Sequence, residues 1–238
     1  MTEQKIIQGD CLEVMKTFPD KSFDLVLTDP PYNVGYAYDI HKDNLSSDEY
    51  FLQQITLLKE SERLLADGGS IFYLNYPEFN SVLWASIDFL QKEDIIAWIY
   101  HTHNRGEPLR KSFRTWLWFS KGSPRNSFFG EYRNPDDKRV KEYIDADIKP
   151  REVDWWLFEQ VKNVSEEKTD HPCQVPTEMV KKIILATTKE NDKIIDPFLG
   201  SGTTLVAAKQ LGRNATGIEI SEKYCEIARK RLSQEMLF

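Results

Sequence analysis

The run Asp29-Pro30-Pro31-Tyr32, called the acidic turn below, follows the apolar segment 23–27 and carries the most specific chemistry in the chain. A proline fixes its own φ angle, lacks a backbone N–H and favours an extended conformation in the residue before it. The turn is therefore stiff and presents a carboxylate and main-chain carbonyls as hydrogen-bond acceptors. A flat heterocycle with an exocyclic amino group fits these acceptors, and the tyrosine ring can stack on its face. These four residues alone fit an acidic residue at a tight structural turn equally well.

A second motif follows the apolar segment 193–195 and reads Asp196-Pro197-Phe198-Leu199-Gly200-Ser201-Gly202-Thr203-Thr204. We call residues 197–204 the glycine-rich turn. Its glycines let a ligand approach the backbone, and a helix expected over 204–211 directs its positive N-terminal end at an anionic group. A Walker P-loop is excluded because no lysine follows Gly202, and a dinucleotide fingerprint is excluded because residue 205 is leucine.

An acidic residue, Glu219, lies near the end of the next predicted strand, which spans residues 215–220. In sheets that bind nucleotides, an acidic residue at this place commonly binds ribose hydroxyls. The alternative for Glu219 is a solvated strand end. The glycine-rich turn stands about fifteen residues earlier, and this spacing favours the ligand-binding interpretation.

Taken together, these motifs resemble those of the amino-methyltransferases that act on DNA and use S-adenosyl-L-methionine. Residues 28–32 look like the catalytic motif of that family, and residues 196–204 look like its cofactor loop. The catalytic motif comes first in this chain, which resembles the circularly permuted β group of the family. Segments 9–13, 65–70 and 171–176 fit as well, so the resemblance covers roughly residues 5–120 and 168–236.

The resemblance implies transfer of a methyl group from S-adenosyl-L-methionine to the N6 amino group of an adenine flipped out of DNA. Asp29, Pro30, Pro31 and Tyr32 would form the catalytic site. The amino group would donate to Asp29 and to the Pro30 carbonyl, with Tyr32 stacked on the base. Such hydrogen bonds make the nitrogen more tetrahedral, direct its lone pair at the methyl carbon and let the carboxylate stabilise the developing positive charge.

The same resemblance implies cofactor-binding residues at several places in the chain. Phe198, Gly200 and Gly202 would line the methionine part, and Ser201, Thr203 or Thr204 would hold its carboxylate. Glu219 would bind the ribose, and Asp10 and Cys11 would lie near the adenine. Asp10 also fits a helix N-cap, and Phe198 also fits plain core packing. The full set is Asp10, Cys11, Asp29, Asp196, Phe198, Gly200, Ser201, Gly202, Thr203, Thr204 and Glu219.

Other acceptors and other chemistries stay open at the level of sequence. The main alternative acceptor is the N4 amino group of cytosine, but an aspartate rather than a serine at the head of the acidic turn resembles the adenine enzymes. RNA, a protein amide, a DNA-binding regulator without catalysis and, remotely, a Rossmann oxidoreductase are further alternatives. Pro172-Cys173-Gln174 resembles the nucleophile motif of cytosine-ring methyltransferases, but its Glu-Asn-Val partner is missing. We therefore expect Cys173 to be a small apolar filler near the cofactor and His171 to be structural or at the cofactor edge.

The formal net charge of −7 argues at first against a nucleic-acid ligand, but the charge is unevenly distributed. Segment 101–151 has twelve Lys and Arg against seven Asp and Glu, which gives +5 and leaves −12 for the rest of the chain. A local basic face guides DNA binding better than total charge does. A solvated loop region is the alternative, mainly for residues 138–149. The DNA-binding residues that we expect are Arg105, Arg110, Lys111, Arg114 and Arg125.

The hydrophobic pattern predicts strands near residues 5–8, 23–28, 70–75, 95–101, 115–120, 193–195 and 215–220. It predicts helices near residues 11–17, 48–65 with Ser47 as N-cap, 78–91, 177–187, 204–211 and 222–234. Strands that alternate with helices indicate an α/β, doubly wound, mainly parallel sheet that binds ligands at the carboxyl ends of its strands. The family resemblance implies seven strands, one of them antiparallel, in a Rossmann-like methyltransferase fold with a small inserted recognition lobe at about 122–168.

The 238 residues fit a single domain over 1–238. The three cysteines, Cys11, Cys173 and Cys225, are widely spaced and fit reduced thiols, and no Cys/His cluster has the spacing of a metal site. Nothing resembles a signal peptide or a membrane span, so we expect a cytoplasmic protein. The expected partners are DNA, a second copy in a homodimer and a restriction endonuclease that acts on the same site.

Overall fold

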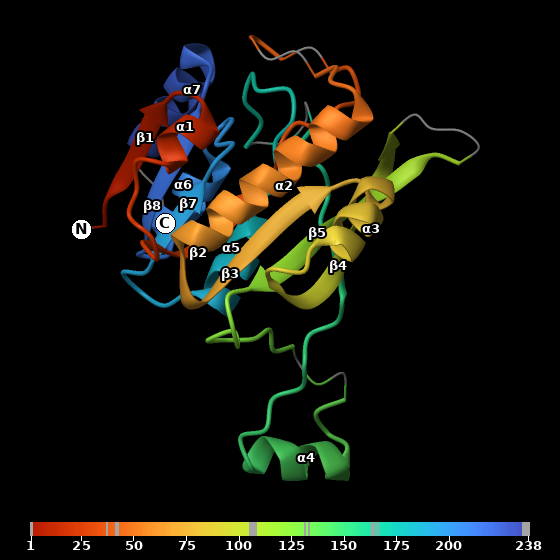
Figure 1. Cartoon of the computed structure of the whole chain (residues 1–238). Helices are drawn as coiled ribbons and strands as arrows, with labels where there is room; N and C mark the ends of the chain where they lie inside the picture. The colour runs from red at the N-terminus through yellow and green to blue at the C-terminus, as the bar shows by residue number, and fades with distance from the viewer. Residues whose placement is uncertain are drawn as a thin grey trace.

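The computed structural model describes residues 2–36, 38–40, 43–104, 109–130, 132, 134–162, 165 and 167–234, with the side chains of residues 103 and 104 excepted. Within these ranges the chain forms one sheet that helices cover on both faces (Figure 1). The strands are β1 (Gln4–Gln8), β2 (Phe23–Thr28), β3 (Leu65–Asn75), β4 (Gln91–Asn104), β5 (Lys111–Ser120), β6 (Trp155–Leu157), β7 (Lys193–Asp196) and β8 (Asn214–Glu219). The helices are α1 (Cys11–Met15), α2 (Ser47–Leu64), α3 (Pro77–Ser86), α4 (Lys138–Asp145), α5 (Thr177–Thr187), α6 (Thr203–Gln210) and α7 (Glu222–Ser233).

The strand order in the sheet is β1-β8-β7-β2-β3-β5-β4-β6. β5 runs antiparallel to β3 and β4, and the other neighbouring pairs are parallel, which confirms a mainly parallel α/β sheet with one antiparallel strand. The described sheet has eight strands instead of the seven expected, because residues 155–157 pair with β4 at its edge. Trp156 turns into the core at this edge, whereas Trp155 and Leu157 face outward.

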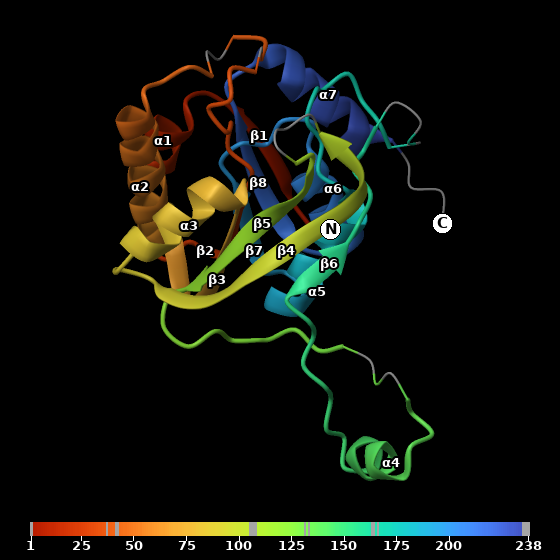
Figure 2. The ribbon, with the colours of Figure 1, turned by 90° about the vertical axis from the view of Figure 1, so that its right-hand side faces the viewer.

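Alternate side chains of each strand enter two separate cores, as the two-residue period of a strand requires. Leu25 and Leu27 of β2 belong to the core that α5, α6 and α7 cover. Val26 of the same strand belongs to the core that α1, α2 and α3 cover. Phe23 joins that second core too, because the register of β2 shifts between Phe23 and Leu25. Figure 2 shows these two groups of helices on opposite sides of the sheet. Because both faces are buried, strands such as β2 are almost continuously apolar.

The chain changes direction across the sheet between β7 and β2. β7 connects through α6 to β8 on one side, whereas β2 connects through α2 to β3 on the other. A crevice opens at such a switch point, beyond the carboxyl ends of the strands. β2 and β7 are paired neighbours, so the acidic turn after β2 and the glycine-rich turn after β7 start side by side at this crevice.

Local capping explains where α2 begins. Ser46, and not Ser47 as expected, is the N-cap: its side chain accepts a hydrogen bond from the Glu49 N–H at 3.3 Å, and the Glu49 carboxylate accepts one from the Ser46 N–H at 3.0 Å. α3 ends at Ser86, earlier than expected, because β4 already begins at Gln91. Among the described helices, none combines the length and the apolar character that crossing a membrane demands.

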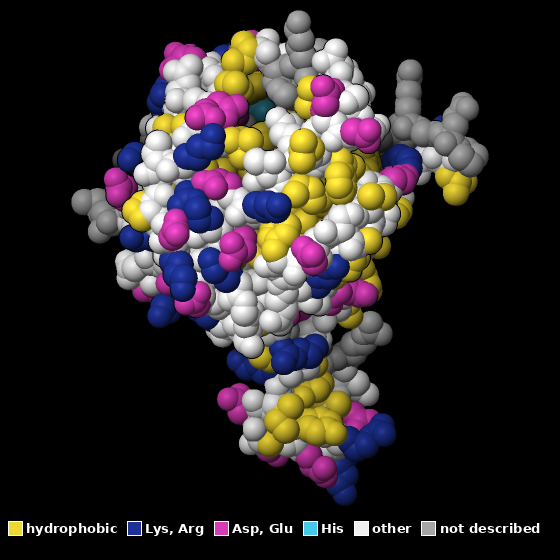
Figure 3. Space-filling view, in the orientation of Figure 1, with side chains coloured by type: hydrophobic (Ala, Val, Ile, Leu, Met, Phe, Trp, Pro, Cys, Tyr) yellow, Lys and Arg dark blue, Asp and Glu magenta, His cyan; other side chains and the backbone are white. Residues whose placement is uncertain are grey.

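Residues 122–168, the expected recognition lobe, divide between the sheet and a projection. β6 belongs to the sheet, whereas α4 stands away from the body of the protein (Figures 1 and 2). α4 buries none of its residues. Tyr143, Ile144 and Ile148 are exposed in and after α4, and Figure 3 shows apolar side chains gathered on this projection. A role of the projection in target recognition stays a prediction.

Candidate active site

A cavity of ≈ 420 Å³ lies at the switch point, and both motifs singled out in the sequence line it. The acidic turn contributes Asp29, Pro30, Pro31 and Tyr32 to one wall. Asp196 and most of the glycine-rich turn form the facing wall. Two corners that stand more than 160 residues apart in the sequence therefore meet at one cavity, as the predicted donor–acceptor arrangement requires.

The acidic turn is fixed by hydrogen bonds within it and from outside it. The Tyr32 hydroxyl donates to Asp29 Oδ1 at 2.5 Å. The Pro31 carbonyl accepts a hydrogen bond from the Tyr50 hydroxyl of α2 at 2.7 Å, and Asn75 at the end of β3 donates to that hydroxyl at 2.8 Å. One hydrogen bond within the turn and a chain from α2 and β3 thus hold the turn in place.

Opposing effects act on the pKa of the Asp29 carboxyl group. Burial raises its pKa, while the nearby Arg114 guanidinium and the hydrogen bond from Tyr32 lower it. The balance is a raised pKa, because desolvation of the charged form outweighs the two favourable contacts. A carboxylate that is stabilised by a few specific contacts in a cavity is suited to respond to a positively charged ligand atom.

The glycine-rich turn is organised around two carboxylates. Phe198 N–H and the Thr204 hydroxyl donate to Asp196, at 3.0 and 2.5 Å. Gly200 N–H donates to Glu219 Oε2 at 2.9 Å. Burial raises the pKa of Asp196 to about 7 and also raises the pKa of Glu219, against the hydrogen bonds that lower both. The cavity therefore has three partly desolvated carboxyl groups in its wall, counting Asp29.

Arg231 of α7, which the sequence did not single out, stands behind the glycine-rich turn. Its Nη1 donates to the Ser201 carbonyl, to Ser201 Oγ and to Thr203 Oγ1 at 3.0, 3.1 and 3.0 Å. A positive charge therefore backs the two hydroxyls expected to hold a ligand carboxylate. Thr204 does not fit that expected role, because its hydroxyl proton is already donated to Asp196. Its side chain lines the cavity nevertheless.

Gly202 differs from the expectation as well, since it is not among the residues that line the cavity. It is the N-cap of α6 with a φ of 86°. A Cβ atom at this position would lie 2.8 Å from the Cβ of Ala228 in α7. The glycine is therefore needed for backbone conformation and for close helix packing.

Asp10 and Cys11 lie at the cavity, as expected for the adenine end of a cofactor. Asp10 is also the N-cap of α1, and its side chain accepts a hydrogen bond from Glu13 N–H at 3.1 Å. The N-cap interpretation of Asp10 is confirmed, and its place beside the adenine of a cofactor stays a prediction. Burial raises the pKa of the Cys11 thiol to about 12, so this thiol is protonated at neutral pH. Phe198 likewise lines the cavity while packing against the core under α1 and α2.

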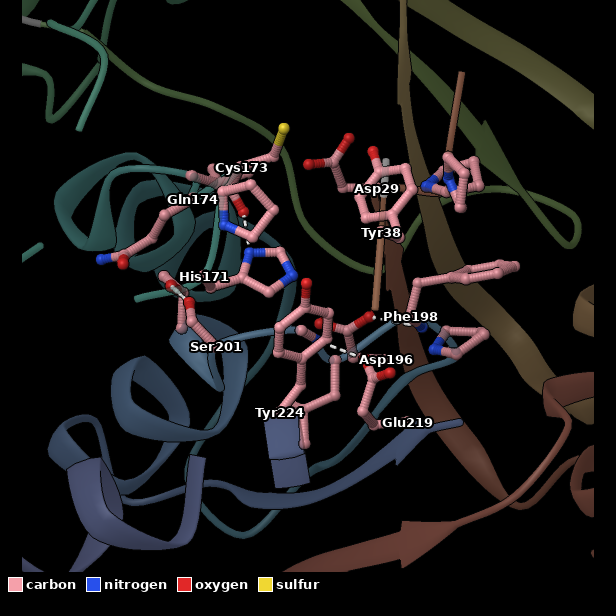
Figure 4. Close-up of a pocket in the computed structure, with 18 of the residues that line it drawn as sticks. Asp29, Tyr38, His171, Cys173, Gln174, Asp196, Phe198, Ser201, Glu219 and Tyr224 are labelled. Atoms are coloured by element: carbon pink, nitrogen blue, oxygen red, sulfur yellow. Dashed lines mark hydrogen bonds between the residues drawn. The ribbon is translucent and has the colours of Figure 1, made fainter. Parts of the chain in front are cut away.

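The segment before α5 closes another side of the cavity. The His171 ring packs edge-on against Tyr224, with 4.4 Å between the ring centroids, and burial lowers the pKa of His171 to about 4. His171 is therefore neutral at physiological pH and packs beside Gly200. Figure 4 shows Cys173, Tyr38 and Asp29 near one another on one side of the cavity, and Asp196 and Glu219 on the other. Burial raises the pKa of Cys173, so the residue has no thiolate character and its expected role as a filler is consistent with its position.

The five expected DNA-binding residues occupy different places. Arg105 lies outside the described residues. Arg110 is exposed, and Lys111 forms an ion pair with Glu78 of α3 at the edge of the sheet that carries the cavity. Arg125 forms an ion pair with Asp24 at the opposite end of β2 from Asp29, so it is far from the cavity mouth.

Arg114 is the clearest departure from the expectation. Its guanidinium does not lie on a basic surface but packs against the aromatic rings of Tyr32, Tyr76 and Trp98 in the cavity wall. No local pattern indicates this position, because Arg114 stands among other basic residues near a turn. Tyr38, Tyr76, Trp98 and Tyr224 also line the cavity without having been expected there.

Comparison with known proteins identifies the family of this chain. The family model of the N6/N4 methyltransferases, described as DNA methylase, matches residues 23–230. The type II methyltransferase M.BglII of Bacillus subtilis is 32% identical, over 97% of this chain and 69% of that protein. The type II methyltransferase M.ScaI of Streptomyces caespitosus is 34% identical, over 97% of this chain and 81% of that protein.

Solved structures share the fold. The PvuII DNA methyltransferase, which is cytosine-N4-specific, superposes with a TM-score of 0.76 at 17% identity, over 100% of this chain and 89% of that one. The complex of M1.HpyAVI with S-adenosyl-L-methionine gives 0.71 at 24% identity, over 97% of this chain and 100% of that one. The extent of the family match and the identity to relatives that align over most of their own length lead to one conclusion. This chain belongs to the N6/N4 family of DNA methylases.

Proposed function

We propose that this protein transfers a methyl group from S-adenosyl-L-methionine to the N6 amino group of a flipped adenine at a specific DNA site. The observation that carries the proposal is the meeting of the acidic turn and the glycine-rich turn at one cavity. One turn offers acceptors for an amino group, and the other offers the backbone and hydroxyl groups that suit a small charged cofactor. The relatives named above, type II methyltransferases of DNA, support the reaction class.

The cavity residues fit S-adenosyl-L-methionine. The volume of ≈ 420 Å³ lies within the range of small-molecule sites. Asp29, Asp196 and Glu219 place three acidic side chains in the wall. A bound sulfonium or ammonium group would favour their ionised forms, against the burial that raises their pKa values. Glu219 can bind ribose hydroxyls with its remaining lone pairs, although Gly200 and Ser221 N–H already donate to it at 2.9 Å each. Ser201 and Thr203, backed by Arg231, suit the carboxylate of the cofactor.

The bound cofactor supplies a methyl group on an excellent leaving group, so the protein chiefly has to orient and tune the nucleophile. Asp29 accepts one amino hydrogen, and the Pro30 carbonyl accepts the other. The Pro31 carbonyl already accepts a hydrogen bond from Tyr50, which favours the Pro30 carbonyl for the ligand-facing role. As positive charge develops on the nitrogen, the Asp29 carboxylate stabilises it, and the surplus proton leaves to water.

Adenine is proposed over cytosine because an aspartate, not a serine, heads the acidic turn. The decisive experiment expresses the chain in a host without DNA methylation and analyses the modified bases by mass spectrometry and by modification-sensitive sequencing. The proposal expects N6-methyladenine at one short recognition site, absent from cells with Asp29→Ala. If the DNA contains N4-methylcytosine and no N6-methyladenine, the acceptor is cytosine. If folded protein is present and no modified base is found, the proposed function is wrong.

A partner protein and a target-recognition segment belong to the same proposal. The type II names of the relatives support a modification enzyme whose site a cognate restriction endonuclease also recognises. Target recognition is assigned to residues 122–168, including α4. Deleting the α4 projection and joining its stems with a short glycine linker tests this, because site preference should be lost while cofactor binding persists.

A further inference from the structure

Arg114 occupies an unusual place for a charged side chain. It stands on β5 directly opposite Trp98 of β4. Its Cζ atom lies 5.1 Å from the ring centroid of Tyr32, 5.3 Å from that of Trp98 and 5.6 Å from that of Tyr76. Tyr32 and Tyr76 meet edge to face with 5.1 Å between their centroids. Three aromatic rings thus surround one guanidinium in the wall of the cavity.

Such a placement needs a compensating negative charge. Taking a guanidinium out of water is costly unless it is paired, and aromatic faces compensate only part of that cost. The buried Nε of Arg114 has no hydrogen-bond partner among the described residues. Burial opposes the charge of Arg114, yet its pKa is raised overall, with Tyr32 and Asp29 as the main causes. Asp29 is the carboxyl group whose charge raises the pKa of Arg114.

We propose that Arg114 is a positioning residue of the methyl-transfer site, whose guanidinium fixes the Tyr32 ring and supplies the positive charge that keeps the Asp29 carboxylate ionised. This inference rests on the proposed function. The Tyr32 hydroxyl is bonded to Asp29 at 2.5 Å, so a ring held by Arg114 also holds the carboxylate. An ionised Asp29 accepts the amino hydrogens, whereas a protonated one would turn a donor toward them. Arg114 therefore acts through Asp29 and Tyr32, without a need to touch the reacting atoms.

The other groups around Asp29 do not supply this charge. Within the described residues, Arg114 is the one charged group that lowers the pKa of Asp29, although Lys162 also lines the cavity. The other titratable side chains near Asp29 bring no positive charge. They are Tyr32 of the same turn, Tyr38 of the following loop, Tyr50 of α2, Tyr73 of β3, Cys173 before α5 and Asp196 of β7. The hydrogen bond from Tyr32 also lowers the pKa of Asp29, but it depends on the ring that Arg114 packs against.

The test is a pH profile of single-turnover methylation for Arg114→Met and Arg114→Lys. An opposite charge within a few ångströms lowers a carboxyl pKa by about 1–3 units, so its loss in Arg114→Met should move the acidic limb of the rate to higher pH by a similar amount. Arg114→Lys should restore most of the limb position while remaining slower, because it keeps the charge but not the planar stacking. Lys92→Met is the matched control: it removes an exposed cation over the Trp84 ring, at 5.8 Å, near the other end of β4.

A second readout needs no methyl transfer. The Asp29 carboxyl carbon, labelled with ¹³C and assigned with Asp29→Asn, is titrated by NMR in the full-length protein and in Arg114→Met. The proposal expects a higher midpoint in Arg114→Met and an unchanged one in Lys92→Met. Equal midpoints, or rates lowered by one factor at every pH in both Arg114 variants, would overturn it and leave a purely structural arginine. If the wild-type protein methylates no DNA while Arg114→Met still has a higher Asp29 midpoint than the wild type, the proposed function is wrong, but the link between Arg114 and Asp29 stands.

Discussion

The hydroxyl of Tyr50 lies 2.7 Å from the main-chain oxygen of Pro31 and joins α2 to the acidic turn. Behind this contact a buried chain of polar groups continues through Asn75 to Tyr73 and Gln54, with donor–acceptor distances of 2.8, 3.1 and 3.0 Å. The stiffness of the turn therefore has two sources. The prolines restrict its φ angles, and the polar chain fixes where the restricted turn points.

Removing the Tyr50 hydroxyl should loosen the acidic turn without touching the cofactor side of the cavity. We expect Tyr50→Phe to lower the single-turnover methylation rate by about 10-fold, because small misplacements of a reacting group are costly. The dissociation constant of the cofactor, measured by calorimetry, should change less than about 2-fold, since Tyr50 does not line the cavity.

Tyr100→Phe provides the control for this prediction. The buried Tyr100 hydroxyl has no hydrogen-bond partner among the described residues, so its removal should leave the rate unchanged and cost no stability. Equal rates for Tyr50→Phe and wild type would show that the prolines alone suffice to position the turn.

The carboxylate of Asp29 should be needed for transfer and not for cofactor binding. We expect Asp29→Ala to lower methyl transfer by at least about 10²–10³-fold, the usual effect of losing one group that stabilises developing charge. Equilibrium binding of S-adenosyl-L-homocysteine should survive, because the glycine-rich turn and Glu219 remain intact. Retained transfer, or loss of cofactor binding together with transfer, would contradict the assignment.

Gly200 should tolerate no side chain, because a Cβ atom there would meet His171 in addition to straining the backbone. Its φ is +52°, and a Cβ atom would lie 3.0 Å from the Cε1 and Nε2 atoms of His171 at the cavity. We expect Gly200→Ala to weaken cofactor binding by at least about 10-fold, or 1.4 kcal/mol. Gly212→Ala is the control, because Gly212 shares a positive φ of +72° but has open space, with Glu190 Cγ 3.9 Å away.

Both glycine variants should lose about 1 kcal/mol of stability or more in denaturant unfolding, since both place alanine at a positive φ. Only Gly200→Ala should change the cofactor dissociation constant. Weakened binding in both variants would assign the effect to general destabilisation instead of to the cavity.

The sequence was sufficient for the parts of the site that local chemistry determines. The acidic turn, Glu219 and the glycine-rich turn each follow a strand, and the rule that parallel strands present ligands at their carboxyl ends brings them together. Arg114 could not be placed in this way, because nothing local distinguishes an arginine on a basic surface from one inside an aromatic cage. Its partners come from the acidic turn, β4 and the end of β3, and only the register of β4 with β5 puts Trp98 opposite it.

The same limit explains the other corrections. Gly202 was expected at the ligand because glycine-rich turns bind ligands, but its neighbour is Ala228 of a helix that begins twenty residues later in the chain. β6 was missed because three residues pair with β4 at an edge, too short a segment for a two-residue hydrophobic period to be recognised. Contacts between distant segments decide both cases, and a single sequence does not contain them.

Asp196 should make stability fall as pH rises from about 4 to about 7, between its unfolded and folded pKa values. Burial raises its pKa from 3.8 to about 7 in the folded protein. Between these values the folded state keeps a proton that the unfolded state has lost, so the free energy of unfolding decreases with increasing pH. At about 1.4 kcal/mol per pH unit, the decrease attributable to Asp196 reaches at most about 4 kcal/mol.

Asp196→Asn keeps the shape and removes the titration, so its stability relative to wild type should rise between pH 5 and pH 8. Urea unfolding at both pH values measures this difference, in which the other titrating groups largely cancel. A constant difference would mean that Thr204 and Phe198 N–H hold Asp196 ionised in spite of its burial.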